Sequence, residues 1–164
     1  MVSPETLRFF QLFAGQDYYM LKEIAMISKE ITIEEGEILF KQGDPAFAMY
    51  LIQEGSVSLA LEFQKNGKGV HVERMGSIGR GEVLGWSSMV NPHIYCFDAK
   101  ITKTAKLIKI EAGSLRELMD DNPKYGYYFL KKINEVIGDR LRYKCIQLLS
   151  LKVTVPEKIP SKTN

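Results

Sequence analysis

Turn-forming residues recur through the middle of the chain, from Ile31 to Ile110, at intervals of about 8 to 12 residues. These signals are Glu35-Gly36, Gln42-Gly43-Asp44-Pro45, Glu54-Gly55, Asn66-Gly67, Gly76, Gly79 and Gly81. The segments between them are rich in β-branched and aromatic side chains, which favour strands. The expected strands are Ala48–Gln53, Val57–Phe63, Val70–Met75, Tyr95–Ile101 and Ala105–Ile110. Short strands at this spacing predict an antiparallel sandwich, roll or barrel.

Helical patterns flank this β region on both sides. Ser3-Pro4 begins a short helix with a hydroxyl cap and a proline at the first helical position, and Asp17 caps a second one. Helical spacing returns near Ser114, and Asn122-Pro123 begins the longest helix, whose apolar stripe runs to Leu149. This helix would be about 40 Å long, which exceeds the width of a small β domain. Part of its stripe must therefore face something other than the roll.

Composition limits the functions open to this chain. Apolar residues make up 45% and charged residues 26% of the 164 residues, as in a globular protein, and a net charge of +2 does not indicate a nucleic-acid partner. A metal site on a β-roll needs clustered histidines and carboxylates, but the chain has only His71 and His93, without ligand spacing. No G-x-S-x-G motif is present, and Cys96 is interpreted as a small residue buried in a strand. We therefore expect a protein that is not an enzyme.

The cellular compartment follows from the cysteines and the hydropathy. Cys96 and Cys145 are too few for a disulfide framework and fit a reducing cytoplasm. The first residues, MVSPETLRFF, lack a cationic segment followed by a long apolar run, so we expect no signal peptide. No stretch approaches the roughly 20 apolar residues needed to span a bilayer. The sequence predicts a cytoplasmic protein without a membrane partner.

A glycine-rich segment, GSIGRGEVLGWSSMVNPHIYCFDA (residues 76–99), carries the most concentrated functional signal. Its glycines permit unusual backbone angles and a close approach of a ligand to the main chain. The run Trp86–Val90 can form one or two helical turns, whose unpaired N–H groups suit a phosphate. Ser87 and Ser88 add hydroxyl donors, and Glu82 lies where a carboxylate can bind a sugar hydroxyl. Two interpretations remain open, a phosphate site or the tight corners of a β-roll.

Three segments, taken in order, resemble a known family: Gly36-Glu37-x-Leu39-Phe40-x-Gln42-Gly43-Asp44, Met49-Tyr50-Leu51-Ile52-x-x-Gly55-Ser56-Val57 and Gly81-Glu82-Val83-Leu84-Gly85. The resemblance is to the cyclic nucleotide-binding domain. It implies a mainly β fold with flanking helices, a double-stranded β-helix jelly roll of about eight strands with a long C-terminal helix. One domain would span residues 1–151, with N-terminal helices in 1–30, the β-roll in 31–110 and C-terminal helices in 111–151, before a flexible tail in 152–164.

The resemblance also implies a ligand site, the phosphate-binding cassette, within residues 79–95. Glu82 would bind the ribose hydroxyl of a cyclic nucleotide such as cAMP or cGMP, and no further cofactor is implied. Backbone N–H groups would hold the cyclic phosphate, at Gly85, Trp86, Ser87 and Ser88. The other residues assigned to the site are Gly81, Val83, Leu84, Ile94 and Tyr95.

One position departs from the family pattern. Relatives whose cassette also reads G-W-S have an arginine two residues after the proline, which pairs with the phosphate, and here that place is Ile94. A hydrogen bond to a charged group contributes about 1.5–3 kcal/mol, so its loss should weaken phosphate binding by roughly one to two decades. Arg80 and Lys100 are candidates to replace the arginine, on their proximity in the sequence alone. In an extended segment, His93 and Tyr95 point to the opposite side from Ile94.

These features support one hypothesis and one alternative. The hypothesis is a stand-alone regulatory or sensor module, in which a nucleotide shifts the long C-terminal helix. The alternative is a degenerate dimeric scaffold that binds no nucleotide. A cassette filled by the protein's own side chains, without a cavity over Glu82, would contradict the sensor.

The long C-terminal helix carries five basic residues, which we interpret as a solvated face: Lys131, Lys132, Arg140, Arg142 and Lys144. Two interpretations of its apolar stripe remain open: the stripe packs on the chain's own roll, or its distal half, Val136–Leu149, pairs with a second copy as a short parallel coiled coil in a homodimer. The excess length of the helix favours pairing. The segment after Leu151 is too short for a helix-turn-helix domain, so direct DNA binding is not expected.

Overall fold

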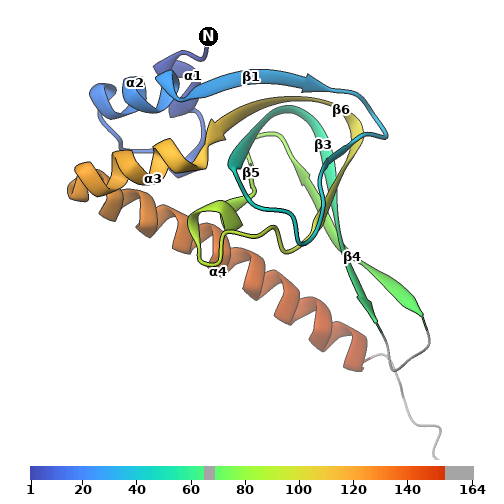
Figure 1. Cartoon of the computed structure of the whole chain (residues 1–164). Coiled ribbons are helices and arrows are strands. Elements are labelled where there is room, and N and C mark those ends of the chain that lie inside the picture. Colours follow the sequence, from blue (N-terminus) through green and yellow to red (C-terminus); the bar gives the residue numbers. More distant parts are fainter. Residues whose placement is uncertain (65–68, 154–164) are drawn as a thin grey trace, which may run out of the picture.

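The computed structural model describes residues 1–64 and 69–153, in which helices flank a six-stranded antiparallel sheet (Figure 1). The N-terminal part holds α1 (Pro4–Arg8), the 3-10 helix η1 (Gln11–Phe13) and α2 (Tyr18–Met26). The strands are β1 (Ser28–Ile33), β2 (Ile38–Phe40), β3 (Ala48–Gln64), β4 (Val70–Gly79), β5 (Val83–Leu84) and β6 (Asp98–Glu111). The 3-10 helix η2 (Trp86–Met89) follows β5, and α3 (Ala112–Asp121) and α4 (Pro123–Val153) follow β6. This is the mainly β fold with flanking helices that the sequence predicts.

The N-terminal helices begin where their capping residues predict. Ser3 caps α1 and Asp17 caps α2, because each side-chain oxygen accepts a hydrogen bond from the backbone N–H three residues later, at 3.1 Å and 2.9 Å. At the other end, α4 continues through Val153. The predicted turn at Asn66-Gly67 and residues 154–164 of the predicted tail lie outside the described residues.

Two long strands, β3 and β6, form the centre of a sheet ordered β1-β6-β3-β4, with β2 paired to β6 and β5 paired to β3. The sequence predicted two strands along β3, Ala48–Gln53 and Val57–Phe63, and two along β6, Tyr95–Ile101 and Ala105–Ile110. These boundaries were wrong, because Glu54-Gly55 bends a strand instead of ending it. With each bent strand counted once, the described residues form six strands where the resemblance implied eight.

Gly55 is the point at which β3 bends, and a side chain does not fit there. Its φ is 89°, in the left-handed region that favours glycine. An added Cβ would lie 2.4 Å from the Thr104 carbonyl oxygen and 2.5 Å from the Ala105 Cα on β6. The register between β3 and β6 shifts on both sides of this point, and Figure 1 shows β3 curving around the roll. Glycine therefore lets the two strands stay in backbone contact while they change direction.

Buried side chains form two hydrophobic clusters. One fills the roll and includes Tyr50, Leu84 and Tyr95. The other joins the N-terminal helices to α3 and the start of α4, where the rings of Phe13 and Phe129 lie 6.1 Å apart. The second cluster anchors α4 to the domain.

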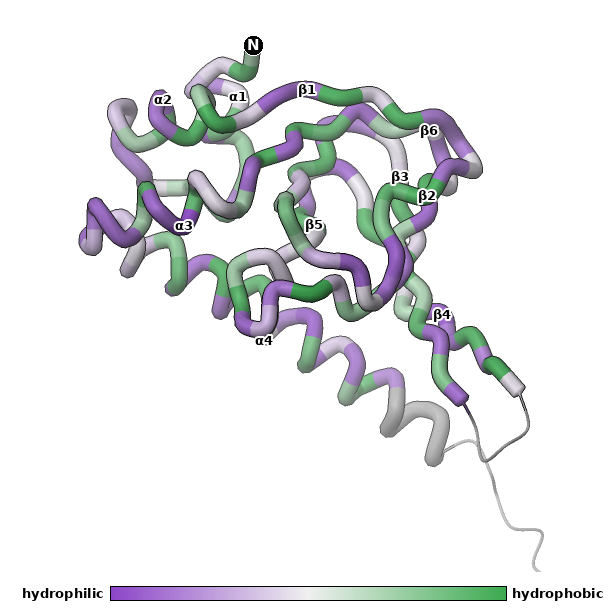
Figure 2. The backbone as a smooth tube through the Cα atoms, in the orientation of Figure 1, coloured by the Kyte–Doolittle hydropathy of each residue, from purple (hydrophilic) through white to green (hydrophobic). Residues whose placement is uncertain are grey.

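On α4, that anchor extends from Tyr125 to Ile137. Phe129 and Ile133 are fully buried, whereas Leu141 and Tyr143 are 63% and 59% exposed. Figure 1 shows α4 running past the roll on the side of the β4 hairpin, and Figure 2 shows hydrophobic and hydrophilic residues alternating along it. The distal half of α4 therefore carries apolar side chains that the described part of the chain leaves exposed.

We expect Gly55→Ala to lower the free energy of unfolding by roughly 2–5 kcal/mol. An L residue at positive φ costs about 1–2 kcal/mol, and overpacking against β6 adds about 1–3 kcal/mol. Gly36→Ala is the matched control, because Gly36 has a φ of 93° but no atom lies within 4 Å of the added Cβ. Its free energy of unfolding should therefore fall only by the cost of the positive φ. Urea denaturation followed by circular dichroism measures both losses. Equal losses would contradict the role of Gly55 as the bend.

Candidate ligand site at the glycine-rich turn

The glycine-rich segment folds into a tight turn that holds Glu82. The Glu82 Oε2 accepts a hydrogen bond from the Gly79 N–H at 2.8 Å, and the Glu82 N–H donates to the Gly79 carbonyl at 3.1 Å. Gly81 has a φ of 86°, and its N–H donates to the Ile52 carbonyl on β3 at 2.8 Å. The turn thus presents an exposed carboxylate whose position is set by backbone hydrogen bonds.

Gly85 carries the chain from β5 into η2 through a narrow space. Its φ is 76°, and an added Cβ would lie 2.9 Å from the Ala48 carbonyl oxygen and 3.3 Å from Cε1 of Tyr95. η2 follows at once, closed by the Ser88 N–H, which donates to the Gly85 carbonyl at 3.0 Å. The predicted short helix is present, in the tighter 3-10 form.

Tyr95 forms the floor of the site. Its ring stacks on Phe40, with centroids 3.7 Å apart and 9° between the ring planes. Its hydroxyl donates to the Ala48 carbonyl at 2.7 Å. Burial raises the pKa of Tyr95 far above its usual range, and the neighbouring Tyr50 adds to this effect. Tyr95 therefore stays neutral and ties the segment before β6 to the start of β3.

The neighbours of Tyr95 are exposed: Ile94 at 40% and Cys96. The extended segment on which the expected alternation of His93, Ile94 and Tyr95 depends is not present, because His93 has a φ of 60°. The prediction that Cys96 is buried in a strand was wrong, because Tyr95 takes the inward position and β6 begins only at Asp98. Neither Arg80 nor Lys100 lines the site.

These elements enclose a small pocket between the roll and α4. Its lining consists of Phe40, Leu59, Leu84, Gly85, Trp86, Ser87, Tyr95, Cys96, Phe97 and Arg140. Half of the predicted site residues belong to this lining: Leu84, Gly85, Trp86, Ser87 and Tyr95. The other half lie outside it: Gly81, Glu82, Val83, Ser88 and Ile94. Ser88 is fully buried, and its hydroxyl has no hydrogen-bond partner among the described residues.

The cation in this pocket comes from α4. Arg140 is half-buried, and its Nη2 donates to the Val83 carbonyl. Burial lowers the pKa of Arg140, while the charge of Glu82 acts in the opposite direction. The interpretation of Arg140 as part of a solvated face was therefore wrong. Arg140 follows Val136 by four residues and Ile137 by three, so it continues the apolar stripe, and that spacing is the signal that could have identified it.

The pocket is closed in this position of α4. Its free volume is about 10 Å³, which is room for about one water molecule and not for a nucleotide. A cassette filled by the protein's own side chains counts against a ligand sensor. However, Arg140, which helps to fill the pocket, belongs to α4 and not to the roll. Among the described residues, Arg140 is the one lining residue of this pocket that α4 contributes.

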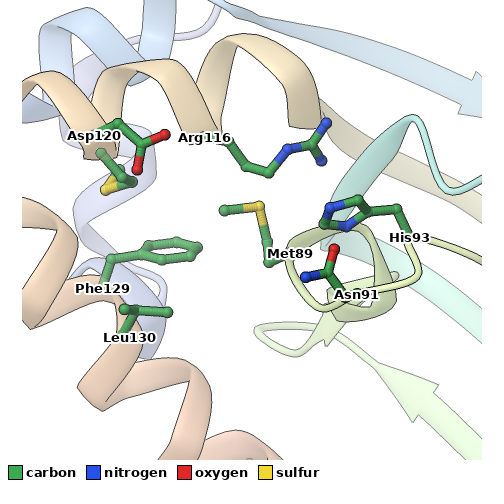
Figure 3. Close-up of a pocket in the computed structure, with 8 residues that line it drawn as sticks. Met89, Asn91, His93, Arg116, Asp120, Phe129 and Leu130 are labelled. Carbon is green, nitrogen blue, oxygen red and sulfur yellow. The ribbon is translucent and has the colours of Figure 1, made fainter.

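A second cavity adjoins η2, between the loop that follows it, α3 and α4 (Figure 3). Its volume is about 280 Å³, and Figure 3 shows Met89 and Phe129 facing each other across it. At its edge, Nη1 of Arg116 on α3 donates to the Ser88 carbonyl at 2.6 Å. This hydrogen bond connects η2 to α3.

Residues 1–64 and 69–153 include both histidines of the chain and all of the described helices. In these ranges no three His, Cys, Asp or Glu side chains are placed together to hold a metal ion. His71 stacks on Phe63 with ring centroids 6.1 Å apart, and His93 lines the second cavity. None of the helices in these ranges has the length and hydropathy that crossing a membrane requires.

Comparison with known protein families gives a match over most of the roll. The family model for the cyclic nucleotide-binding domain matches residues 30–122, more than half of the chain. A potassium channel protein of Rhodopseudomonas palustris, provisionally named as such, is 26% identical over 132 residues, which are 80% of this chain and 29% of that protein. The chain thus spans less than a third of this relative's length.

Solved structures share the architecture. A protein from Geobacter metallireducens, provisionally assigned as cyclic nucleotide-binding, is 30% identical with a TM-score of 0.75, over 86% of this chain and 99% of that one. A cyclic nucleotide-binding domain from Methylobacillus flagellatus is 19% identical with a TM-score of 0.75, over 94% of this chain and 84% of that one. These similarities confirm the jelly-roll architecture that the sequence predicted.

We expect Tyr95→Phe to flatten the alkaline dependence of stability. The unfolded chain releases the tyrosine proton near a pKa of about 10, whereas burial raises the pKa of Tyr95 in the folded protein. Above about pH 10 the folded state therefore binds more protons than the unfolded state, and the free energy of unfolding falls as the pH rises. Urea denaturation from about pH 8 to pH 11 measures this slope in both proteins.

The same variant has an internal control at lower pH. It keeps the ring that stacks on Phe40 and loses the hydrogen bond to Ala48, so its free energy of unfolding near pH 8 should be lower by about 1–3 kcal/mol. An alkaline slope equal to that of the wild type would show that Tyr95 is not the group responsible.

Proposed function

Because the chain belongs to the cyclic nucleotide-binding domain family, we propose that it is a non-catalytic regulatory module that senses a nucleotide at its glycine-rich turn. This proposal rests on one observation: Gly85, Trp86 and Ser87 line the same pocket as Arg140 of α4. A ligand at this turn contacts both the roll and the helix. Binding is therefore coupled to the position of α4.

The ligand that suits this turn is a cyclic nucleotide such as cAMP or cGMP. The Glu82 carboxylate, held by the Gly79 N–H, can accept hydrogen bonds from ribose hydroxyls. The family resemblance assigns the cyclic phosphate to the N–H groups of Gly85, Trp86, Ser87 and Ser88, of which the Ser88 N–H donates to the Gly85 carbonyl. Ribose and phosphate would then bind at the two ends of β5.

The signal would leave the module through α4. Buried Phe129 and Ile133 anchor the first half of the helix, while Arg140 connects the distal half to the Val83 carbonyl. Because the closed pocket has no room for a nucleotide, binding requires the distal half to move. That movement repositions the exposed face around Leu141, where a partner can detect it.

The partner in this proposal is a second copy of the chain. Leu141 and Tyr143 are exposed on the distal half of α4, where burial against another helix would stabilise them. Two such helices can pair as a short parallel coiled coil. A ligand bound to one copy then shifts the α4 of that copy, and the pairing of the two helices carries the shift to the other copy.

We propose that the module lies in the cytoplasm. Cys96 and Cys145 are free and exposed, and exposed thiols persist in reducing compartments. Neither cysteine has a reactive role in the proposed function.

The alternative function is a dimeric scaffold that binds no nucleotide. Two observations favour it, namely the closed pocket and the apolar Ile94 at the place of the family's arginine. Sensor and scaffold use the same surface of α4. Nucleotide binding is therefore the property that separates them.

The fluorescence of Trp86, the single tryptophan of the chain, tests nucleotide binding. Trp86 lines the pocket, so cAMP or cGMP at up to about millimolar concentration should change its emission and raise the melting temperature. Glu82→Gln should weaken binding about tenfold or more, because it removes a charged acceptor. Glu73→Gln, on the exposed part of β4 outside the pocket, is the matched control. No response to either nucleotide would favour the scaffold.

Light scattering tests the dimer. At micromolar concentration we expect a mass of about twice 18.7 kDa. Leu141→Glu should give a monomer, because it places a charge in the pairing face. Tyr127→Glu, at a 65% exposed position on the first half of α4, should stay dimeric. A wild-type mass near 18.7 kDa would contradict the dimer.

A further inference from the structure

Arg140 is the one charged residue that lines the cassette pocket in the described part of the chain. Its guanidinium donates to the Val83 carbonyl, which is a neutral acceptor. Both ion pairs found between described residues lie elsewhere on α4, and neither includes Arg140. The side chain therefore brings a positive charge into the pocket that no carboxylate of the described residues pairs at ion-pair distance.

Partial burial makes this charge unfavourable without an anion. A guanidinium has five N–H donors, and the Val83 carbonyl accepts from one of its nitrogens. Removing a charge from water costs free energy unless an opposite charge or several hydrogen bonds compensate it. Burial accordingly lowers the pKa of Arg140, against the influence of Glu82. A half-buried guanidinium with a neutral partner favours an anion in the space beside it.

No other cationic side chain of the described residues lines the pocket. Ile94, at the position of the family's arginine, is apolar and 40% exposed. Arg80 and Lys100 do not line the pocket. Among the described residues, Arg140 is therefore the cation that can meet a phosphate at η2 without rearrangement of the roll.

We propose that Arg140 supplies, from α4, the positive charge that pairs with the phosphate of the bound nucleotide, in place of an arginine at position 94. This inference rests on the proposed function. On binding, the guanidinium leaves the Val83 carbonyl and forms a two-pronged pair with the phosphate oxygens. The phosphate then binds only when α4 places Arg140 beside it, so one side chain couples affinity to the position of the helix.

The test compares cAMP with adenosine, which lacks the phosphate, by isothermal titration calorimetry. Arg140→Gln should weaken cAMP binding about 10- to 100-fold and leave adenosine binding within about twofold, because only the charged hydrogen bonds to phosphate are lost. Ile94→Arg in the Arg140→Gln background should restore most of the affinity for cAMP, since the charge then comes from the roll.

Arg142→Gln is the matched control for this experiment. Arg142 lies two residues further along α4, is exposed and pairs with Asp139. Its substitution removes the same charge from the helix outside the pocket. It should leave the affinities for cAMP and adenosine unchanged.

Two results would overturn the inference and leave the proposed function standing. Unchanged cAMP affinity in Arg140→Gln would show that the phosphate does not use this charge. Tighter binding in the same variant would show that Arg140 only blocks the pocket. Binding of cAMP by Ile94→Arg but not by the wild type would overturn the inference and the proposed function together, because the natural chain would then lack the cation that the phosphate needs. If no form binds cAMP while all keep the wild-type circular dichroism, the proposed function fails and the inference fails with it.

Discussion

The antiparallel pairing of β3 with β6 places every other part of this molecule. The two strands run side by side from the pair Ala48 and Glu111 to the pair Ala60 and Asp98. They bend together because Gly55 leaves room for the β6 backbone. β3 also carries β5, and with it the glycine-rich turn, while the end of β6 leads directly into α3 and α4. One ladder of hydrogen bonds thus positions both the candidate ligand site and the helix that closes it.

The two halves of α4 are held by interactions of different strength. Burying side chains such as Phe129 and Ile133 contributes about 1.5–3 kcal/mol each. In the distal half, Ile137 packs against the hydrophobic cluster, and Arg140 further along donates a hydrogen bond to the Val83 carbonyl. A hydrogen bond from a charged group contributes about 1.5–3 kcal/mol. A ligand that offers Arg140 a better acceptor replaces this hydrogen bond and can leave the hydrophobic cluster in place. Such an asymmetry suits a helix whose position responds to a ligand.

The local features of the fold were predictable, and the errors have specific physical causes. Ser3 and Asp17 cap the first helices as expected, since a cap depends on residues three apart. Glu54-Gly55 was taken as the end of a strand, because glycine with a positive φ serves equally in a turn and in a bend. Only the contact with β6 distinguishes the two. Arg140 was assigned to solvent from its charge, although its spacing continues the apolar stripe.

The sequence by itself determined the type and order of the elements and the chemistry of the glycine-rich turn, because these depend on residues close together in the chain. Only the tertiary structure decided that α4 lies over η2 and that the turn's pocket is closed. Arg140 and Val83 are 57 residues apart in the sequence, and their contact depends on how two separate hydrophobic clusters pack. No local pattern encodes such a contact, since it is the joint result of all the side chains that set the direction of the helix.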